Sequence, residues 1–563
     1  MHSERPVLNS KVDPVLAELL RSQLLGLLED MGKVLSRNAV SSEIVQEKDY
    51  ANAVLFDRGE VVMVDNPLFL GTASATAAVM QDLFQFAMKP GDVILSNDPY
   101  SGGTHIQDFT LLAPFFDGRE RICFILCRAH LPDIGGQVPG GYYPFADDVW
   151  AEGSRIPPLK IVQENKPVGD KLDAITINSR CPEAFDLNLR AMLAALETGK
   201  ARLRSMLEKY GKKQLREGMQ HCLDIAESQL RSEAAGWPYG DYEGISVLDH
   251  DARGGANLEV KAQIHFGEKV IVDLSMSAPQ SSGFVNSSRA NTISYALIPF
   301  YSLLSKSIPF NSALLRVIEV VTTEGTVVHP RYPAAVGWGP FHVGAEIVSA
   351  VAQALGKAIP NLAAVLAPKF LMLRARWPGQ PIAFPLHTFL QGGSPGVYGV
   401  DGWGSPGPFS RPVTPSIEMV ESTLPISLRR LELLPNSAGA GKWRGGFGTV
   451  AEFEFTDRVI VDGVVEGQSH PCEPLAGGSP AAPNSIQIGK GSPPVQGLVW
   501  DCDVSSQVVI ARMGGGGGWG VAAERDREAI ARDEENDLLS DVGAAELSAH
   551  SAAADSAPGR EQP

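Results

Sequence analysis

The stretch NDPYSGGTHIQDFTLLAPFFDGRERICFILCRAHLPDIGG, residues 97–136, decides how this chain is interpreted. It contains two strand-like runs, 108–116 and 121–130, in which apolar and aromatic residues dominate. The pair Asp117-Gly118 separates the runs, and an Asp-Gly pair favours the tight turn of a β-hairpin. The sequence therefore predicts an antiparallel hairpin over these residues.

The position of the turn also predicts the register of this hairpin. If the turn is centred between residues 118 and 119, the numbers of paired residues add to about 237. Asp108 then lies opposite Ala129, which is next to His130, at the open end of the hairpin. This register brings a carboxylate and an imidazole close to each other.

Residues with metal-binding side chains gather at the open end of the hairpin. His105 lies in the loop just before Asp108, and His130 ends the partner strand. Two imidazoles and a carboxylate are a common ligand set for Zn²⁺, Mn²⁺ or Fe²⁺, and three protein ligands leave a position for water or substrate. The alternative is structural, because His-x-x-Asp is frequent by chance and a histidine at a strand end is often only hydrogen-bonded.

Asp133 follows the hairpin closely enough to serve the same site. One interpretation is catalytic: its carboxylate orients a ligand histidine or relays a proton. The other is a turn aspartate that follows Pro132. The residues alone leave both interpretations open.

The remaining chain predicts a mixed α/β (α+β) fold, with an N-terminal metal-bearing half and a β-rich C-terminal half. Helical periodicity or composition marks five segments: 13–37, 71–88, 183–232, 344–355 and 522–538. After Gly236-Trp237-Pro238 the β signals become frequent, for example at 426–434 and 449–465. We expect three regions: an α/β metal-binding region at 1–235, a β-rich region with Gly/Pro-rich loops at 236–540, and a disordered tail at 541–563.

Composition excludes several classes of protein. The 563 residues carry a formal charge of −17, which argues against general nucleic-acid binding. No apolar run reaches the roughly 18 residues that a membrane span needs. The six cysteines form no CxxC pair, so neither a zinc finger nor a disulfide scaffold is indicated. We expect a cytoplasmic protein.

Several motifs together resemble one known family, hydantoinase B/oxoprolinase. The stretch above carries the resemblance as LSNDPYSGGTHIQDFTLLAPFF followed by RAHLPDIGG. Further segments fall in the family's order: EKDYANAVLFD (47–57), EGSRIPPLKIV (152–162), DLSMSAPQSSGFVN (273–286), KWRGGFGTV (442–450) and GGGGWG (515–520). The family includes N-methylhydantoinase, 5-oxoprolinase, the caprolactamase β subunit and the α-type subunits of acetone and acetophenone carboxylases.

The resemblance implies a divalent metal held by His105, Asp108 and His130. Zn and Mn are the expected metals, and Fe is the alternative. It also makes Asp49 a candidate fourth ligand, although that aspartate is equally well interpreted as fixing a strand end. It further implies an enzyme, the metal-binding subunit of an ATP-dependent cyclic-amide hydrolase of the hydantoinase, oxoprolinase or lactamase type. The alternatives are a subunit of an ATP-dependent ketone carboxylase, an ATP-independent metallohydrolase and a non-catalytic scaffold subunit.

The resemblance also implies a hetero-oligomer in which a hydantoinase A-type partner subunit mainly binds the ATP. Consistent with this, GAGKWRGG (439–446) lacks the GxxxxGK[ST] spacing of a phosphate-binding loop. Two segments, 337–351 and 398–426, depart from the family's pattern, so the sequence does not name the cyclic amide or ketone substrate. His342 and His387 lie near Gly-rich loops and are weaker candidates for the site.

Overall fold

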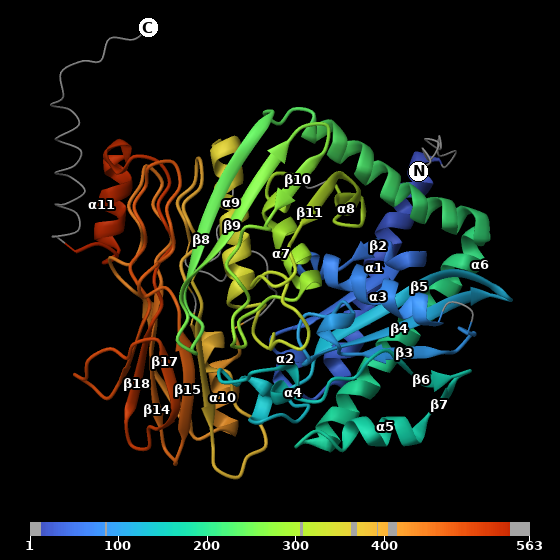
Figure 1. The fold of residues 1–563 in the computed structure, drawn as a ribbon, viewed down its shortest axis with the longest axis horizontal. Coiled ribbons are helices and arrows are strands. Elements are labelled where there is room, and N and C mark those ends of the chain that lie inside the picture. Colours follow the sequence, from blue (N-terminus) through green and yellow to red (C-terminus); the bar gives the residue numbers. More distant parts are fainter. Residues whose placement is uncertain are drawn as a thin grey trace, which may run out of the picture.

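The computed structural model describes residues 13–84, 87–304, 308–361, 369–390, 392–403 and 414–540. Helices and four β-sheets make up these ranges, and the predicted mixed α/β class is confirmed (Figure 1). Within them, no helix combines the length and apolar character that a membrane span requires. The predicted tail, residues 541–563, lies outside the described residues.

The predicted hairpin lies at the centre of a seven-stranded antiparallel sheet with the order β2-β1-β5-β4-β3-β6-β7. Its strands are β1 (Tyr50–Leu55), β2 (Val61–Val64), β3 (Val93–Ser96), β4 (Asp108–Asp117), β5 (Glu120–His130), β6 (Leu159–Gln163) and β7 (Lys166–Pro167). Both faces of this sheet are covered, so the central strands are buried along almost their whole length.

The register of the hairpin differs from the prediction by one residue. At the tip Asp117 pairs with Glu120, as the turn predicts. A β-bulge between Phe115 and Phe116 then shifts the pairing, so that Asp108 faces His130 and not Ala129. A bulge places two residues of one strand opposite one of the other, which the turn sequence alone does not reveal.

Side chains of the central strands alternate between two hydrophobic cores. Ile125 and Cys127 pack on the side of two helices, α1 (Pro14–Asn38) and α6 (Pro182–Ala234). Phe124 and Leu126 point to the other core. This two-sided burial fixes the register, because a slip of one residue would reverse every side chain.

Helices α1 and α6 cover one face of the sheet and pack side by side in antiparallel directions, with Gln23 bonded to Tyr210 and Asp30 to Arg202. Asp13 accepts a hydrogen bond from the Val15 amide and so caps α1. A side chain at Gly218 of α6 would lie only 2.3 Å from Leu20 of α1, so the absent side chain permits this close packing. Helix α6 is interrupted at Gly211, whose φ of 77° suits glycine.

The other face of the sheet packs against a central layer. Its helices are α3 (Leu70–Phe84), α7 (Arg289–Tyr301), α8 (Ala313–Val317) and α9 (Val343–Ala358). Its four-stranded sheet has the order β11-β10-β9-β8, with β8 (Gly240–His250), β9 (Ala256–Phe266), β10 (Val270–Asp273) and β11 (Ile318–Val321). One continuous core joins both sides of residue 235, and the boundary expected there stays a prediction.

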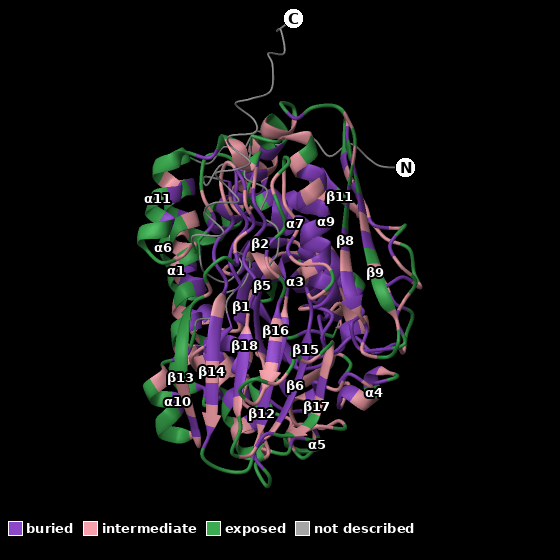
Figure 2. Ribbon diagram, turned by 90° about the vertical axis from the view of Figure 1, so that its left-hand side faces the viewer, coloured by how far each residue is buried: buried purple, intermediate pink, exposed green. Residues whose placement is uncertain are grey.

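Two sheets that share a third core form the C-terminal part (Figures 1 and 2). One has the order β12-β15-β17 and the other β13-β14-β18-β16. The strands are β12 (Leu371–Arg376), β13 (Ile426–Leu433), β14 (Thr449–Phe455), β15 (Ile460–Val465), β16 (Ser485–Ile488), β17 (Leu498–Asp503) and β18 (Val508–Arg512). Short helices complete the chain: α2 (Ser42–Val45), α4 (Val149–Glu152), α5 (Gly169–Thr176), α10 (Ile417–Thr423) and α11 (Arg527–Glu535).

We predict that Leu24→Ala lowers the melting temperature. Leu24 of α1 is fully buried, and removing a buried leucine side chain costs about 2–5 kcal/mol through lost burial and the cavity that remains. Val15→Ala on the same helix is the control, because that side chain is 77% exposed. Thermal unfolding followed by circular dichroism gives the comparison, and equal shifts for both variants would contradict the packing.

Candidate metal centre

The predicted ligands meet where neighbouring strands of the seven-stranded sheet end. Asp108 is the first residue of β4, His130 is the last residue of β5, and the two are paired. Asp49 immediately precedes β1, and its carbonyl accepts a hydrogen bond from the His130 amide at 3.2 Å. His105 comes from the loop between the 3₁₀ helix η3 (Pro99–Ser101) and β4.

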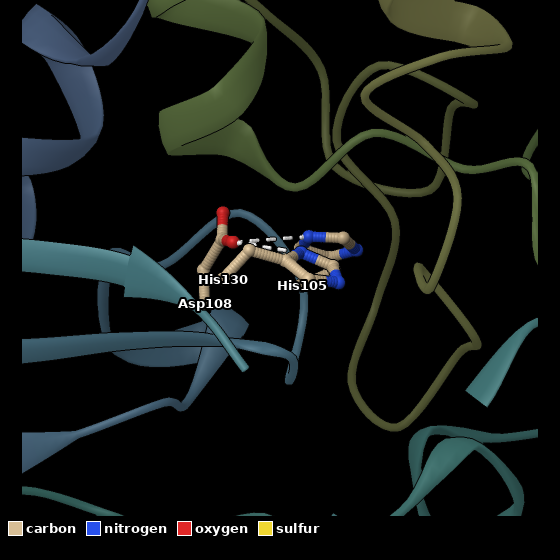
Figure 3. Close-up of side chains that lie close together, drawn as sticks. All are labelled: His105, Asp108 and His130. Carbon is tan, nitrogen blue, oxygen red and sulfur yellow. Dashed lines mark ion pairs between the residues drawn. The ribbon is translucent and has the colours of Figure 1, made fainter. Parts of the chain in front are cut away.

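One carboxylate oxygen joins the two imidazoles (Figure 3). Asp108 Oδ1 lies 3.2 Å from His105 Nε2 and 3.3 Å from His130 Nδ1. His105 and Asp108 are buried, and the His130 side chain is 12% exposed. Metal–ligand bonds of about 2.0–2.2 Å place neighbouring ligand atoms roughly 3–3.5 Å apart, which these separations match.

The hydrogen bonds around the cluster leave its inner atoms available. The His105 Nδ1 lies 2.5 Å from the Gly337 carbonyl. Because a carbonyl can only accept, Nδ1 carries a proton, and Nε2 is the nitrogen that would bind a metal. Thr104 donates to Asp108 Oδ2, which leaves Oδ1 facing the imidazoles.

His130 supplies the observation that tests whether a metal fits. Its Nδ1 is buried and, among the described residues, has no hydrogen-bond partner, although Asp108 Oδ1 is near. An unsatisfied buried polar atom costs free energy, and a cation between the three ligand atoms would remove that cost. His105, Asp108 and His130 also form a group whose ligand atoms all lie within 4.8 Å of one another. The residues therefore fit a divalent cation.

The local charge favours a cation as well. Burial alone would raise the pKa of Asp108, but the neighbouring charge of His105 and the contacts of both histidines hold it well below its usual range. Burial alone would lower the pKa of His130, but Asp108 and the charges of Asp49 and Glu43 raise it to about 9. The site therefore attracts positive charge, and a bound metal would replace the proton of His130.

Asp49 lies at the rim of this group. Its Oδ2 is 3.9 Å from His130 Nδ1, and burial raises the pKa of its carboxyl to about 6. Its position beside His130 supports its role as a fourth ligand, which stays a prediction.

Asp133 makes a different set of contacts. Its carboxylate is fully buried and accepts hydrogen bonds from the amides of Gly135, Gly140 and Arg180 and from the Arg180 guanidinium. These bonds hold the loop after the hairpin in place. Among the described residues neither ligand histidine bonds to Asp133, and its catalytic role stays a prediction.

Sequence reasoning missed the residues that orient His105. The Gly337 carbonyl carries no side-chain signal, and it belongs to a segment that departs from the family's pattern. Glu152 holds that segment by accepting hydrogen bonds from the Gly337 amide at 2.5 Å and the Val336 amide at 3.2 Å. Burial raises the pKa of Glu152 to about 8.

Two small cavities meet at the cluster. One, of about 50 Å³, is bordered by His105 and Asp108, and the other, of about 60 Å³, by His130 and His387. Asp49 and Phe341 border both. The second cavity shares four lining residues with a surface groove of about 660 Å³: Glu43, Pro132, Ala383 and Pro385. The groove and the second cavity therefore adjoin at these four residues.

We predict that the purified chain binds one divalent metal and that His130→Ala abolishes this binding, because the variant removes one of three converging ligands. His265→Ala is the matched control, since His265 is a half-exposed residue of β9 paired with Asp241. Elemental analysis by plasma mass spectrometry measures the metal, and circular dichroism checks the fold. Equal metal content in wild type and His130→Ala would refute the assignment.

Comparison with known proteins places these features in one family. The sequence model of hydantoinase B/oxoprolinase matches residues 13–522. Caprolactamase subunit beta of Pseudomonas jessenii is 28% identical over 561 residues, covering 95% of each chain.

Two solved structures share the fold. The crystal structure of ATP-dependent caprolactamase from Pseudomonas jessenii aligns with a TM-score of 0.86 and 28% identity, covering 95% of this chain and 96% of that one. Nucleotide-free acetone carboxylase aligns with a TM-score of 0.86 and 16% identity, covering 96% of this chain and 80% of that one. The family match extends over most of the sequence, and this chain belongs to the hydantoinase B/oxoprolinase family.

Proposed function

We propose that this chain is the metal-binding subunit of an ATP-dependent cyclic-amide hydrolase that works with a hydantoinase A-type subunit. The observation that carries the proposal is the convergence of His105 Nε2, Asp108 Oδ1 and His130 Nδ1 beside a cavity. The name of the relative that aligns over 95% of both chains, caprolactamase subunit beta, supports a lactam or related cyclic amide as substrate.

The chemistry of an amide explains why ATP is required. An amide carbon is a weak electrophile, because the nitrogen lone pair is shared with the carbonyl. Phosphorylation of the amide oxygen as an imidate removes that protection and leaves the carbon open to water. ATP supplies the phosphoryl group, and the sequence lacks the usual phosphate-loop spacing. We therefore assign nucleotide binding mainly to the partner subunit.

The described residues hold and enclose the site. His105, Asp108 and His130 would bind the ion, which when bound lowers the pKa of a coordinated water or polarises an oxygen of the substrate. The Gly337 carbonyl fixes the ring of His105, and the side chains of Trp338 and Phe341 line the cavity with apolar surface. This surface limits the access of bulk water to the reacting carbon.

Asp133 contributes to the same cavity through the backbone. Gly140 borders the cavity and donates its amide hydrogen to the Asp133 carboxylate at 3.2 Å. We propose that Asp133 positions the wall of the cavity that Gly140 forms. Any effect of Asp133 on proton transfer would then come from the position of this loop.

The second candidate function is a subunit of an ATP-dependent ketone carboxylase. Acetone carboxylase shares the fold at 16% identity, and a shared fold does not select between hydrolysis and carboxylation. The higher identity to caprolactamase, 28%, favours the hydrolase.

We expect turnover only when both subunits, metal and ATP are present, because each subunit supplies one part of the reaction. The chain is incubated with metal, ATP and a panel of lactams, hydantoins and ketones with bicarbonate, with and without the co-encoded subunit. ADP and product are measured, with Asp108→Asn as the metal-site control.

The outcomes separate the candidates. Ring-opened product from the pair supports the proposal, and a carboxylated ketone would select the carboxylase. Turnover by this chain alone would favour an ATP-independent metallohydrolase. Turnover by the pair that Asp108→Asn leaves unchanged would indicate a scaffold subunit.

A further inference from the structure

His387 is a second histidine that borders the same cavity as the predicted ligand His130. It lies in the 3₁₀ helix η5 (Leu386–Phe389), which follows β12 and belongs to the C-terminal part of the chain. The metal ligands come from the N-terminal sheet, yet His130 and His387 border the same cavity of about 60 Å³. The walls of the cavity therefore come from two distant parts of the sequence.

The protonation of the His387 ring follows from one contact. Its Nδ1 lies 3.3 Å from the carbonyl oxygen of Leu373 in β12. Because that oxygen only accepts, Nδ1 carries the hydrogen and Nε2 keeps the lone pair. Within the described ranges no hydrogen bond to Nε2 occurs, so this nitrogen is free to accept a proton in the cavity.

The surroundings keep the ring neutral and oriented. Phe370, Trp338 and Phe341 pack edge-on, with ring centroids 5.5, 6.2 and 6.3 Å from that of His387. Burial lowers the pKa of His387 to about 4, and the nearby charges of His130 and Arg374 add to this effect. The ring is therefore neutral with a fixed tautomer, and the lone pair on Nε2 is present without prior loss of a proton.

Trp338 connects this histidine to the metal centre. Its ring centroid lies 6.2 Å from the rings of both His105 and His387. The indole of Trp338 therefore contacts both His105 and His387, and a substrate in the cavity that His130 and His387 border would lie near both of these histidines.

We propose that His387 Nε2 accepts the proton of the water that attacks the amide carbon, an inference that rests on the proposed hydrolase function. The oxygen of the water forms a bond to the carbon of the phosphorylated imidate while one proton moves to Nε2 and the electron pair of the C=N double bond moves to nitrogen. Nitrogen takes that proton back from Nε2. The C–N bond then breaks as the new hydroxyl group gives its proton to nitrogen, which opens the ring to an amine and an acyl phosphate. A second water hydrolyses the acyl phosphate to the carboxylate and inorganic phosphate, so the phosphoryl group that ATP supplied leaves as phosphate.

The first test is chemical labelling, which does not depend on activity. Diethyl pyrocarbonate acylates a neutral imidazole with a free nitrogen, and peptide mass spectrometry identifies the site. In the metal-loaded full chain we expect His387 and the half-exposed His265 to react. His342 should not react, because it is buried, its Nε2 contacts the Tyr142 hydroxyl at 3.2 Å, and it borders none of the described cavities. An unmodified His387 beside a modified His265 would overturn the proposal.

The second test is His387→Gln in the complete complex, since glutamine keeps the size and polarity but accepts no proton. We expect ring opening to slow by about 10²–10⁴-fold, with metal content, subunit assembly and ADP formation retained. Added imidazole should restore part of the rate to His387→Ala. His265→Gln is the control and should match the wild type.

Two results of this second test would overturn the inference. One is a wild-type rate of ring opening in His387→Gln. The other is a loss of metal or of assembly in that variant, which would make the role structural. A wild-type complex that opens no cyclic amide would refute the proposed function instead, and the labelling result would still decide whether Nε2 is available.

Discussion

The pairing of Asp108 with His130 across β4 and β5 is the constraint on which the site depends. The bulge near the hairpin tip shifts this pairing by one residue, so the carboxylate and the imidazole stand directly opposite each other. The same sheet places Asp49 beside His130 through a backbone hydrogen bond, because β1 pairs with β5. Two buried cores hold the register of these strands, and so the packing of the sheet determines the geometry of the ligands.

The site also depends on distant segments. The Gly337 carbonyl fixes the ring of His105, and Glu152 fixes Gly337 in turn. Trp338, the next residue, packs its indole against His105 and against His387 of the C-terminal part, with ring centroids 6.2 Å apart in each pair. A short segment before α9 therefore joins the N-terminal ligands to the C-terminal wall of the cavity. One of the hydrophobic cores also continues across residue 235.

The sequence predicted the features that a short stretch of neighbouring residues determines. The hairpin, its turn and the predicted ligands His105, Asp108 and His130 follow from a short motif, and the structure brings these three residues together. The predicted register of the hairpin was wrong by one residue. The β-bulge that shifts it does not follow from the turn residues Asp117 and Gly118. The Gly337 carbonyl left no signal, since any residue carries a carbonyl. Strands β16 and β18 also escaped prediction, because strands of four and five residues are too short to show a clear periodicity.

The central claim is that a divalent metal binds between His105, Asp108 and His130. Anomalous X-ray diffraction from crystals of the metal-loaded chain, recorded on both sides of the metal's absorption edge, tests this most directly. We predict one strong anomalous peak at bonding distance, about 2.0–2.2 Å, from His105 Nε2, Asp108 Oδ1 and His130 Nδ1. A peak elsewhere in the chain, with these three side chains bonded only to one another, would contradict the claim.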